Sequence, residues 1–586
     1  MILLRRFAWV LLFACAPLAA QHRIQPERLP ADTFFYFHWR GEESLGASRE
    51  KNPLIGLWRD PELAPMRDAV ATRLTQEIFK GRIPAEVSPA DIWAMLGCEM
   101  LFGHVQRPGL AKPATVPADP QGEPPPAPRY APNEFLIVNY AGKEELAKKM
   151  NELVPPDPDE TIVTEEFRGI TIGIATGKRG TYYQADFAPW HISAGDRKLF
   201  EELIVRFEAA TAPADSLTQS ERHRRALQQA APGTFLVFFM QFVWDQMGDA
   251  LGSQDVRVVT ALRGLGFEKF HGMTMNLRAA GDTGELRVAI LGDTSPGSFF
   301  DLLGANQTRE ATLAYAPAKA YSFASAQVDL PATYKLVRDA ALAALPPEQF
   351  AAVGAVEGMI EAQLGLPLGE LLAQFGGEFG MIAPQATADP LAQLFIITLR
   401  QPERVLQVLR KLFAPMIVSE SEEGDATLLT LLFSRADPQT KEAKSTAIRV
   451  AVTPGALLVA RDEPILRDAL RLRAAGPDAA GRLVSDASYR QARARLPESL
   501  SALSYSNLTA VNWDALLAEM EKTMREQAEK QAAADPQKAA KDAENLRQVL
   551  DWMRKFPPSV LKRHLHTMVS GCRKDATGLY CDGFVN

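Results

Sequence analysis

The sequence predicts an α+β fold made of two tandem copies of a mainly antiparallel sheet-plus-helices module. The first observation is a recurrence: Phe135–Tyr140, followed by a charged helical segment, returns 260 residues later as Phe395–Arg400. The second is a pair of segments 266 residues apart, His191–Asp196 and Leu457–Asp462. The third is that short β-rich runs are joined as hairpins, with helical segments between the sets. This order is typical of antiparallel α+β proteins. The two sheets, one per copy, could lie side by side or join into one.

In the first copy, runs rich in aromatic and β-branched residues alternate with segments of helical periodicity. Asp196 is expected to cap the N-terminus of the helix that follows it. We expect strands at 34–39, 100–105, 134–140, 162–166, 170–175, 182–193, 233–242, 271–277 and 285–291, and helices at 53–79, 92–96, 143–153 and 196–207, with a helical segment ending near 265.

The second copy is expected to repeat this order. Asp462 is the predicted N-cap that matches Asp196, and His223–Ala226 recurs as Tyr489–Ala492. We expect strands at 320–328, 378–382, 394–399, 500–507, 564–569 and 579–584, a hairpin within 447–460, and helices at 369–375 and 402–413.

The predicted domain boundaries follow from this repeat. Residues 1–20 form a signal peptide, 21–310 the first copy and 311–586 the second. Two segments have no counterpart of equal length in the other copy. They are a proline-rich loop at 107–132, expected as a surface insertion or a ligand for a proline-binding partner, and a helical hairpin at 513–555.

The predicted hairpin carries an apolar stripe at helical spacing, through Trp513, Leu517, Met520 and Met524 on its first helix. Such a stripe usually packs on its own domain. The alternative is that the hairpin is a docking arm for another molecule.

The N-terminus has the pattern of an export signal. Arg5 and Arg6 precede a short apolar run, and small residues then allow cleavage between Ala20 and Gln21. The run is too short to cross a bilayer as a helix, which takes about 20 residues. Because residues 12–15 resemble a lipobox, a lipid anchor at Cys15 is the alternative. We therefore expect an exported protein of the periplasm or cell envelope, without a transmembrane helix in the mature chain.

Charge excludes one class of partner. The 586-residue chain has a formal net charge of −7. Proteins that bind nucleic acid present a basic surface to the phosphate backbone. We therefore expect no nucleic-acid partner, and the partner or apolar ligand remains open.

The cysteines are consistent with export. Cys98 lies in an apolar stretch, where a thiol behaves as a small hydrophobe. Cys572 and Cys581 flank a turn signal at Asp575–Gly578 and should face each other across a hairpin, so an oxidising compartment favours a disulfide. A loop this short should contribute about 2–3 kcal/mol. A two-cysteine metal site is the weaker alternative, because no second pair of ligands lies nearby.

Chemistry-bearing motifs are scarce, and no catalytic, cofactor-binding or metal-ligating residue is assigned. His564 and His566 could bind a metal only if a third ligand approached. Glu99 and Glu378 each follow a glycine-containing turn. A carboxylate in an apolar setting can act as an acid. The favoured interpretation is structural: each glutamate accepts backbone N–H bonds where the chain enters a strand.

A family resemblance rests on the export signal, the opening Leu29–Thr33, the Gly376–Glu378 turn and the recurring segments. With these, the chain resembles a family of exported bacterial proteins described only as a domain of unknown function. The resemblance covers most of the mature chain, and it implies no activity, cofactor or catalytic residue. The second copy departs from the opening, with Ala316–Ala320 where the first has Leu29–Thr33.

The leading functional hypothesis is a non-enzymatic, exported binding or scaffolding protein of the cell envelope. The alternative is a hydrolase with a site in the cleft between the two copies. A third hypothesis is a carrier of lipid or another apolar ligand. A smooth apolar groove would favour binding, and converging histidine, aspartate or serine side chains would favour hydrolysis.

Overall fold

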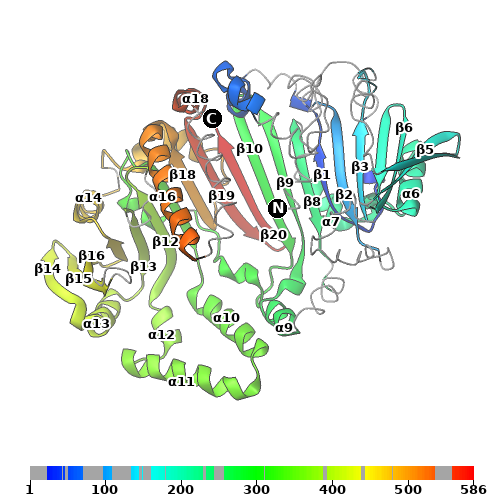
Figure 1. Ribbon diagram of the computed structural model, residues 1–586. Helices are drawn as coiled ribbons and strands as arrows, with labels where there is room; N and C mark the ends of the chain where they lie inside the picture. The colour runs from blue at the N-terminus through cyan, green and yellow to red at the C-terminus, as the bar shows by residue number, and fades with distance from the viewer. Residues whose placement is uncertain are drawn as a thin grey trace. The chain divides into compact units, whose positions relative to one another are not determined.

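A computed structural model shows the fold of the chain (Figure 1). It describes residues 23–41, 44–45, 51–69, 97–107, 133–143, 145, 148, 160–177, 180–228, 233–242, 244, 256–308, 310–386, 392–436, 443–477, 479–534 and 557–586. The predicted signal peptide with Cys15, Ala20 and Gln21 lies outside these residues. So do nearly all of the proline-rich loop and the second helix of the predicted hairpin.

The chain divides into two compact units. The first unit comprises residues 1–242 and 271–291, and the second comprises 243–270 and 292–586. The segment that contains α9 (Val256–Gly264) therefore belongs to the second unit, although it precedes the last two strands of the first.

Within its described residues, the first unit contains ten strands, paired antiparallel wherever their register is defined. Their order across the sheet is β4-β5-β6-β7-β3-β2-β1-β8-β9-β10. The strands are β1 (Thr33–Trp39), β2 (Glu99–Val105), β3 (Glu134–Asn139), β4 (Thr161–Phe167), β5 (Ile170–Gly177), β6 (Gly180–Phe187), β7 (Trp190–Ala194), β8 (Thr234–Gln241), β9 (Phe270–Ala280) and β10 (Thr283–Gly292). The named α-helices are α2 (Pro53–Arg59), α6 (Arg197–Glu208) and α7 (Glu221–Leu227).

The second unit shows the corresponding order, β14-β15-β16-β17-β13-β12-β11-β18-β19-β20. Its strands are β11 (Ser322–Gln327), β12 (Phe375–Ala383), β13 (Leu394–Leu399), β14 (Ile417–Glu423), β15 (Ala426–Ala436), β16 (Ala443–Val452), β17 (Ala456–Ala460), β18 (Ala502–Asn507), β19 (Thr567–Asp575) and β20 (Gly578–Val585). Besides α9, its helices are α10 (Leu330–Ala344), α11 (Pro347–Leu364), α12 (Leu368–Leu372), α13 (Pro402–Leu412), α14 (Glu463–Ala474), α15 (Ala487–Arg493), α16 (Trp513–Ala534) and α18 (Pro558–His564).

The prediction of two tandem copies of a sheet-plus-helices module is wrong, because the twenty strands belong to one sheet. The α+β class and the antiparallel pairing of the strands agree with the prediction. The physical reason is that the edge of a sheet exposes unpaired N–H and C=O groups, which can pair with a further strand. Periodicity along a sequence does not show which strands meet at such an edge.

The two openings make the same backbone bonds although their sequences differ. Leu217 N–H donates to Leu29 O at 2.9 Å in the first unit, and Leu483 N–H donates to Ala316 O at 2.8 Å in the second. Main-chain hydrogen bonds do not depend on side-chain identity. The difference between Leu29–Thr33 and Ala316–Ala320 therefore leaves this local structure unchanged.

Several predicted elements need correction at their ends. The predicted strand at 564–569 begins only at Thr567, because His564 ends helix α18. The predicted helix at 369–375 ends at Leu372, and β12 begins at Phe375. The hairpin of β14 and β15 had no predicted counterpart. The turn at Glu423–Asp425, between two β-rich runs, is the signal that could have indicated it.

The second unit has a hydrophobic cluster on each face of its strands, and one of them involves α14 and α15. Leu466 and Leu470 of α14 and Tyr489 of α15 pack there against buried strand side chains such as Phe323 and Leu503.

Alternation along each strand sends the intervening residues to the opposite face. On that opposite face Val405 of α13 packs in a second cluster with Leu429 and Val450, and Ile397 packs against it. The candidate site lies on this face, beside the second cluster.

Candidate functional site: an apolar groove on the sheet

Strands β13, β12, β11, β18 and β19 are neighbours in the sheet of the second unit, in the part of the ribbon that Figure 1 labels β12, β13, β18 and β19. An apolar groove lies across these five strands. Alternation decides which side chains line it. On β11, Phe323 and Ser325 are buried, whereas Ala324 and Ala326 are half-buried. The half-buried set faces away from the core of α14 and α15, and this set forms the groove.

Strand pairing arranges the groove side chains in two rows across the sheet. The first row joins directly paired residues of the five strands: Ile397, Phe379, Ala326, Ala502 and Cys572. Two large apolar side chains at one end are followed by two alanines and then by a disulfide-bonded cysteine. The alanines leave a depression between taller neighbours.

The second row repeats this profile one step along the strands. It joins Phe395, Met381, Ala324, Ser504 and Ser570. The floor of the groove therefore follows β11 and β18, where each groove-facing residue of the two rows is alanine or serine. Its wall is the large side chains of β12 and β13.

The groove has a volume of about 490 Å³. Pockets for small ligands have volumes of roughly 300–1,000 Å³ and are lined mainly by apolar groups. Among the residues that the structure describes, no aspartate, glutamate, lysine, arginine or histidine lines the groove. This described lining can bind an apolar molecule, but it offers no acid, base or metal ligand for a reaction.

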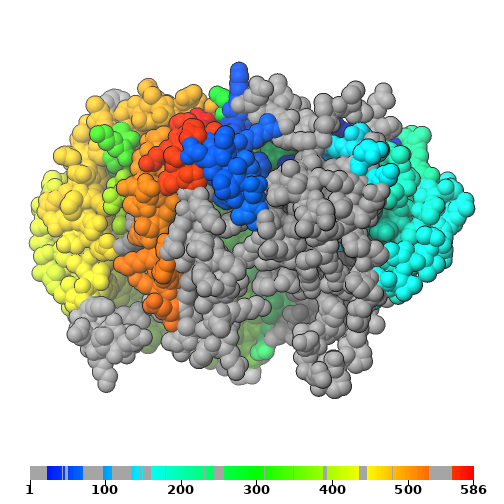
Figure 2. Space-filling view, turned by 45° about the horizontal axis from the view of Figure 1, so that its top comes forward, coloured from blue at the N-terminus to red at the C-terminus, as the bar shows by residue number. Residues whose placement is uncertain are grey.

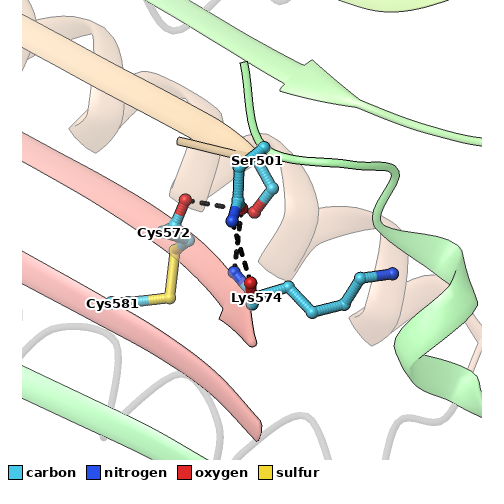
Figure 3. Close-up of a disulfide and its surroundings, with 5 residues drawn as sticks. Ser501, Cys572, Lys574 and Cys581 are labelled. Atoms are coloured by element: carbon cyan, nitrogen blue, oxygen red, sulfur yellow. Dashed lines mark hydrogen bonds between the residues drawn. A yellow bond between two sulfur atoms is a disulfide. The ribbon is translucent and has the colours of Figure 1, made fainter. Parts of the chain in front are cut away.

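A disulfide lies at one end of the first row, where Cys572 pairs directly with Cys581 across the β19–β20 hairpin (Figure 3). The sulfur atoms are at disulfide distance, 2.07 Å, as the turn signal predicted. Ser501 anchors the same point, since its N–H donates to Cys572 O at 2.7 Å and its hydroxyl donates to that oxygen at 3.1 Å.

The Asn306 side chain holds β19 next to the disulfide. It accepts from Lys574 N–H at 2.9 Å through Oδ1 and donates to Lys574 O at 2.8 Å through Nδ2. These bonds occupy main-chain groups that a strand edge would otherwise expose. The groove therefore ends at a strand that is fixed covalently and by hydrogen bonds.

Glu378 has the structural role that the sequence predicted. It is 2 % exposed. Its Oε2 accepts from Ala311 N–H at 2.8 Å, and its Oε1 accepts from Thr312 N–H at 2.8 Å and from the Thr312 hydroxyl at 2.6 Å. The carboxylate thereby ties the segment before β11 to β12, and it does not face the groove.

Glu99 is the counterpart in the first unit and is also buried. Its Oε2 accepts from Ile24 N–H at 2.8 Å and from Asn139 Nδ2 at 3.2 Å, and its Oε1 lies 3.0 Å from His38 Nε2. His38, 1 % exposed, was missed by sequence reasoning. Alternation along β1, which places His38 on the same face as buried Tyr36, is the signal that could have found it.

A second buried polar pair was also missed in the first unit. The Tyr36 hydroxyl lies 3.0 Å from His223 Nε2, and both residues are fully buried. Burial lowers the pKa of His223 to about 4 and raises the pKa of Tyr36. These groups lie inside the core, so they serve packing rather than contact with a ligand.

The residues considered as metal ligands do not come together. Within the described ranges, no group of three histidine, cysteine, aspartate or glutamate side chains could hold a metal ion. Cys98 is buried and not disulfide-bonded, as its apolar surroundings indicated. Among the helices that the structure describes, none combines the length and the apolar character needed to cross a membrane.

Comparison with known proteins adds no relative: no protein-family model, curated protein or solved structure matches the chain. The resemblance to an exported bacterial family stays a prediction. The groove geometry therefore carries the functional argument.

Proposed function

We propose that this is an exported, non-enzymatic binding protein of the cell envelope that holds an apolar ligand in the groove of β11, β12, β13, β18 and β19. The observation that carries this proposal is the two-row profile, with a floor of alanine and serine beside a wall of phenylalanine, methionine and isoleucine. An apolar ligand removes this surface from water and gains about 25 cal/mol per Å² of apolar area buried.

Export is the second part of the proposal. The apolar leader with its cleavage pattern and the Cys572–Cys581 bond are consistent with an oxidising compartment. The described lining of the groove has no charged side chain, which favours an uncharged ligand portion over an ionic one. Because this lining also has no acid–base pair, binding accounts for the site better than hydrolysis does.

Binding of N-phenyl-1-naphthylamine, an uncharged dye whose fluorescence rises in apolar surroundings, tests the proposal. The purified chain should give a saturable rise in fluorescence. Ser504→Phe places a ring on the groove floor between Ala324 and Ser570. This variant should weaken dye binding by at least about tenfold, since it fills the space that the dye would occupy.

Ser419→Phe is the matched control. Ser419 is exposed on β14, away from the groove strands. The control should bind the dye as the unsubstituted chain does, and circular dichroism should show that both variants are folded. If the unsubstituted chain shows no saturable binding, or if Ser504→Phe binds with unchanged affinity, the groove is not the binding site.

A further inference from the structure

The first unit provides an internal comparison for the groove, because its strands follow the corresponding order. Tyr36 on β1 pairs directly with Phe239 on β8. In the second unit, Phe323 on β11 pairs directly with Tyr505 on β18. The rings of Phe239 and Tyr505 each meet the third residue of a short helix, α7 or α15, edge-to-face. The two pairs are therefore equivalent, and they align the strands of the two units residue by residue.

At the aligned positions, the first unit is filled where the second unit is open. The strand pairing that continues from the aligned pairs shows which residues correspond along the second row of the groove. Three bulky side chains of the first unit have small counterparts there: Phe37, Phe238 and Met275 correspond to Ala324, Ser504 and Ser570. The groove is therefore a specific feature of the second unit, and it does not follow from the order of the strands alone.

Two of these small residues bring hydroxyl groups into the groove. Ser504 on β18 and Ser570 on β19 are directly paired, and both line the groove. Side chains paired in this way have Cβ atoms about 4.5–5.5 Å apart, so one ligand atom can reach both hydroxyls. Within the described part of the chain, neither hydroxyl has a hydrogen-bond partner.

Other directly paired hydroxyl residues in this chain bond with each other. Ser434 on β15 pairs with Ser445 on β16, and their Oγ atoms are 3.0 Å apart. Thr176 on β5 pairs with Thr181 on β6, and their Oγ1 atoms are 3.2 Å apart. The serine pair in the groove differs from these two pairs, because its hydroxyls stay available to a ligand.

A ligand that covers the groove pair must supply a hydrogen-bond acceptor. Covering a hydroxyl without giving it a partner costs free energy. If the two serines bonded with each other beneath a hydrocarbon, one hydroxyl proton would still lack an acceptor. A carbonyl oxygen has two lone pairs and can accept from both hydroxyls. The described lining offers no lysine, arginine or histidine to neutralise a carboxylate, so a neutral carbonyl compound fits better than an anion.

We propose that the ligand of the groove is a neutral fatty ester. Its alkyl chain packs against the large side chains of β12 and β13, and its carbonyl oxygen accepts from the hydroxyls of Ser504 and Ser570. This inference rests on the proposed function and adds the chemical class of the ligand. The two serines determine specificity, whereas the wall of β12 and β13 supplies the apolar contact.

Displacement of 1,6-diphenylhexatriene, a hydrocarbon dye that fluoresces in apolar surroundings, tests the proposal. The unsubstituted chain should bind the dye saturably, and methyl decanoate should displace it. Ser504→Ala combined with Ser570→Ala removes both hydroxyls and changes the shape of the groove little. The affinity for methyl decanoate should fall by about tenfold, since two hydrogen bonds are lost. Binding of the dye should not weaken, because a hydrocarbon makes no hydrogen bond.

Ser434→Ala combined with Ser445→Ala is the matched control. This pair is exposed on β15 and β16, outside the groove. Figure 2 shows the yellow segment around these two strands at the surface of the molecule. The control should bind the dye and methyl decanoate as the unsubstituted chain does, and circular dichroism should show that both double variants are folded. Decanoate, the corresponding anion, should displace the dye less well than its methyl ester.

The outcomes that overturn the proposal can be told apart. If the unsubstituted chain binds neither the dye nor the ester, the groove function fails and the ester assignment fails with it. If the dye binds and Ser504→Phe weakens it, but the double alanine variant keeps its affinity for methyl decanoate, the groove function stands and the ester assignment is wrong. Equal losses for dye and ester in that variant would show that the serines only shape the groove. Equal displacement by decanoate and its methyl ester would exclude selection of a neutral ligand.

Discussion

His223 and Tyr489 occupy equivalent places on two short helices, yet they respond to acid differently. Each is the third residue of its helix, and its N–H donates to an N-cap side chain: His223 to Ser220 Oγ at 3.2 Å, and Tyr489 to Asp486 Oδ1 at 2.9 Å. The local backbone is therefore alike in α7 and α15. Any difference arises from the ring that each helix buries.

The packing of these rings is also alike. His223 meets Phe239 edge-to-face, with ring centroids 5.0 Å apart, and Tyr489 meets Tyr505 edge-to-face at 5.2 Å. The same site thus accepts an imidazole in one unit and a phenol in the other. The comparison teaches that packing geometry and charge response are separable: only the imidazole titrates at moderately acidic pH.

The largest expected effect is an acid-sensitive contribution to stability from His223. The unfolded chain protonates this imidazole near its ordinary pKa of about 6.5, whereas burial holds the folded pKa at about 4. The part of the free energy of unfolding that depends on the His223 proton is therefore fully present above pH 6.5. It is lost as the pH falls from about 6.5 to about 4. Below that, both states are protonated. The loss is about 3 kcal/mol, measured by urea unfolding at each pH.

The matched variants isolate this effect from acidic residues that also titrate. Tyr36→Phe combined with His223→Phe removes both polar partners, which costs little when the shapes are kept. The double variant should lack the His223 part of the pH dependence. Tyr489→Phe should retain it. An unchanged slope between pH 6.5 and pH 4 in the double variant would contradict the assignment to His223.

The two buried glutamates give the next comparison. Both oxygens of Glu378 accept from donors of Ala311 and Thr312. Glutamine offers one acceptor oxygen, and its NH₂ group would face an N–H donor. Glu378→Gln should therefore destabilise the protein by about 2–3 kcal/mol, because a buried donor is left unsatisfied. The free energy of unfolding in urea at pH 7 measures it.

Glu99→Gln should cost less, about 1 kcal/mol, because one of its partners can adapt. A neutral imidazole can carry its proton on either nitrogen, so His38 Nε2 can accept from a glutamine NH₂ group. The glutamine oxygen keeps the bonds from Ile24 and Asn139. Equal losses in the two variants would show that His38 does not adapt in this way.

Local features of the fold were predictable because their signals lie close together in the sequence. The Phe395–Arg400 run corresponds to β13, Leu394–Leu399, since alternation along a strand needs only a few residues. Cys572 and Cys581 flank a recognisable turn, so their pairing followed from the hairpin. The structural role of Glu378 followed from the turn before it.

The groove could not be predicted, because it depends on the register of segments far apart in the chain. Ala324, Met381 and Ser504 become neighbours only when β11 pairs with β12 and β18. Alanine and serine carry no chemical signal in a sequence. The sequence left open whether the strands form one sheet or two for a related reason, since edge pairing has no local pattern.

The smallest expected effect separates two N-caps that the sequence treated as equal. Asp196 Oδ1 accepts from Leu199 N–H at 2.9 Å, whereas the Asp462 side chain makes no capping bond to α14. Asp196→Ala should therefore cost about 1 kcal/mol, the usual value of a helix cap. Asp462→Ala should change stability by less than about 0.5 kcal/mol, as a surface substitution does. Urea unfolding measures both, and a loss at Asp462 equal to that at Asp196 would mean that Asp462 caps α14 in solution.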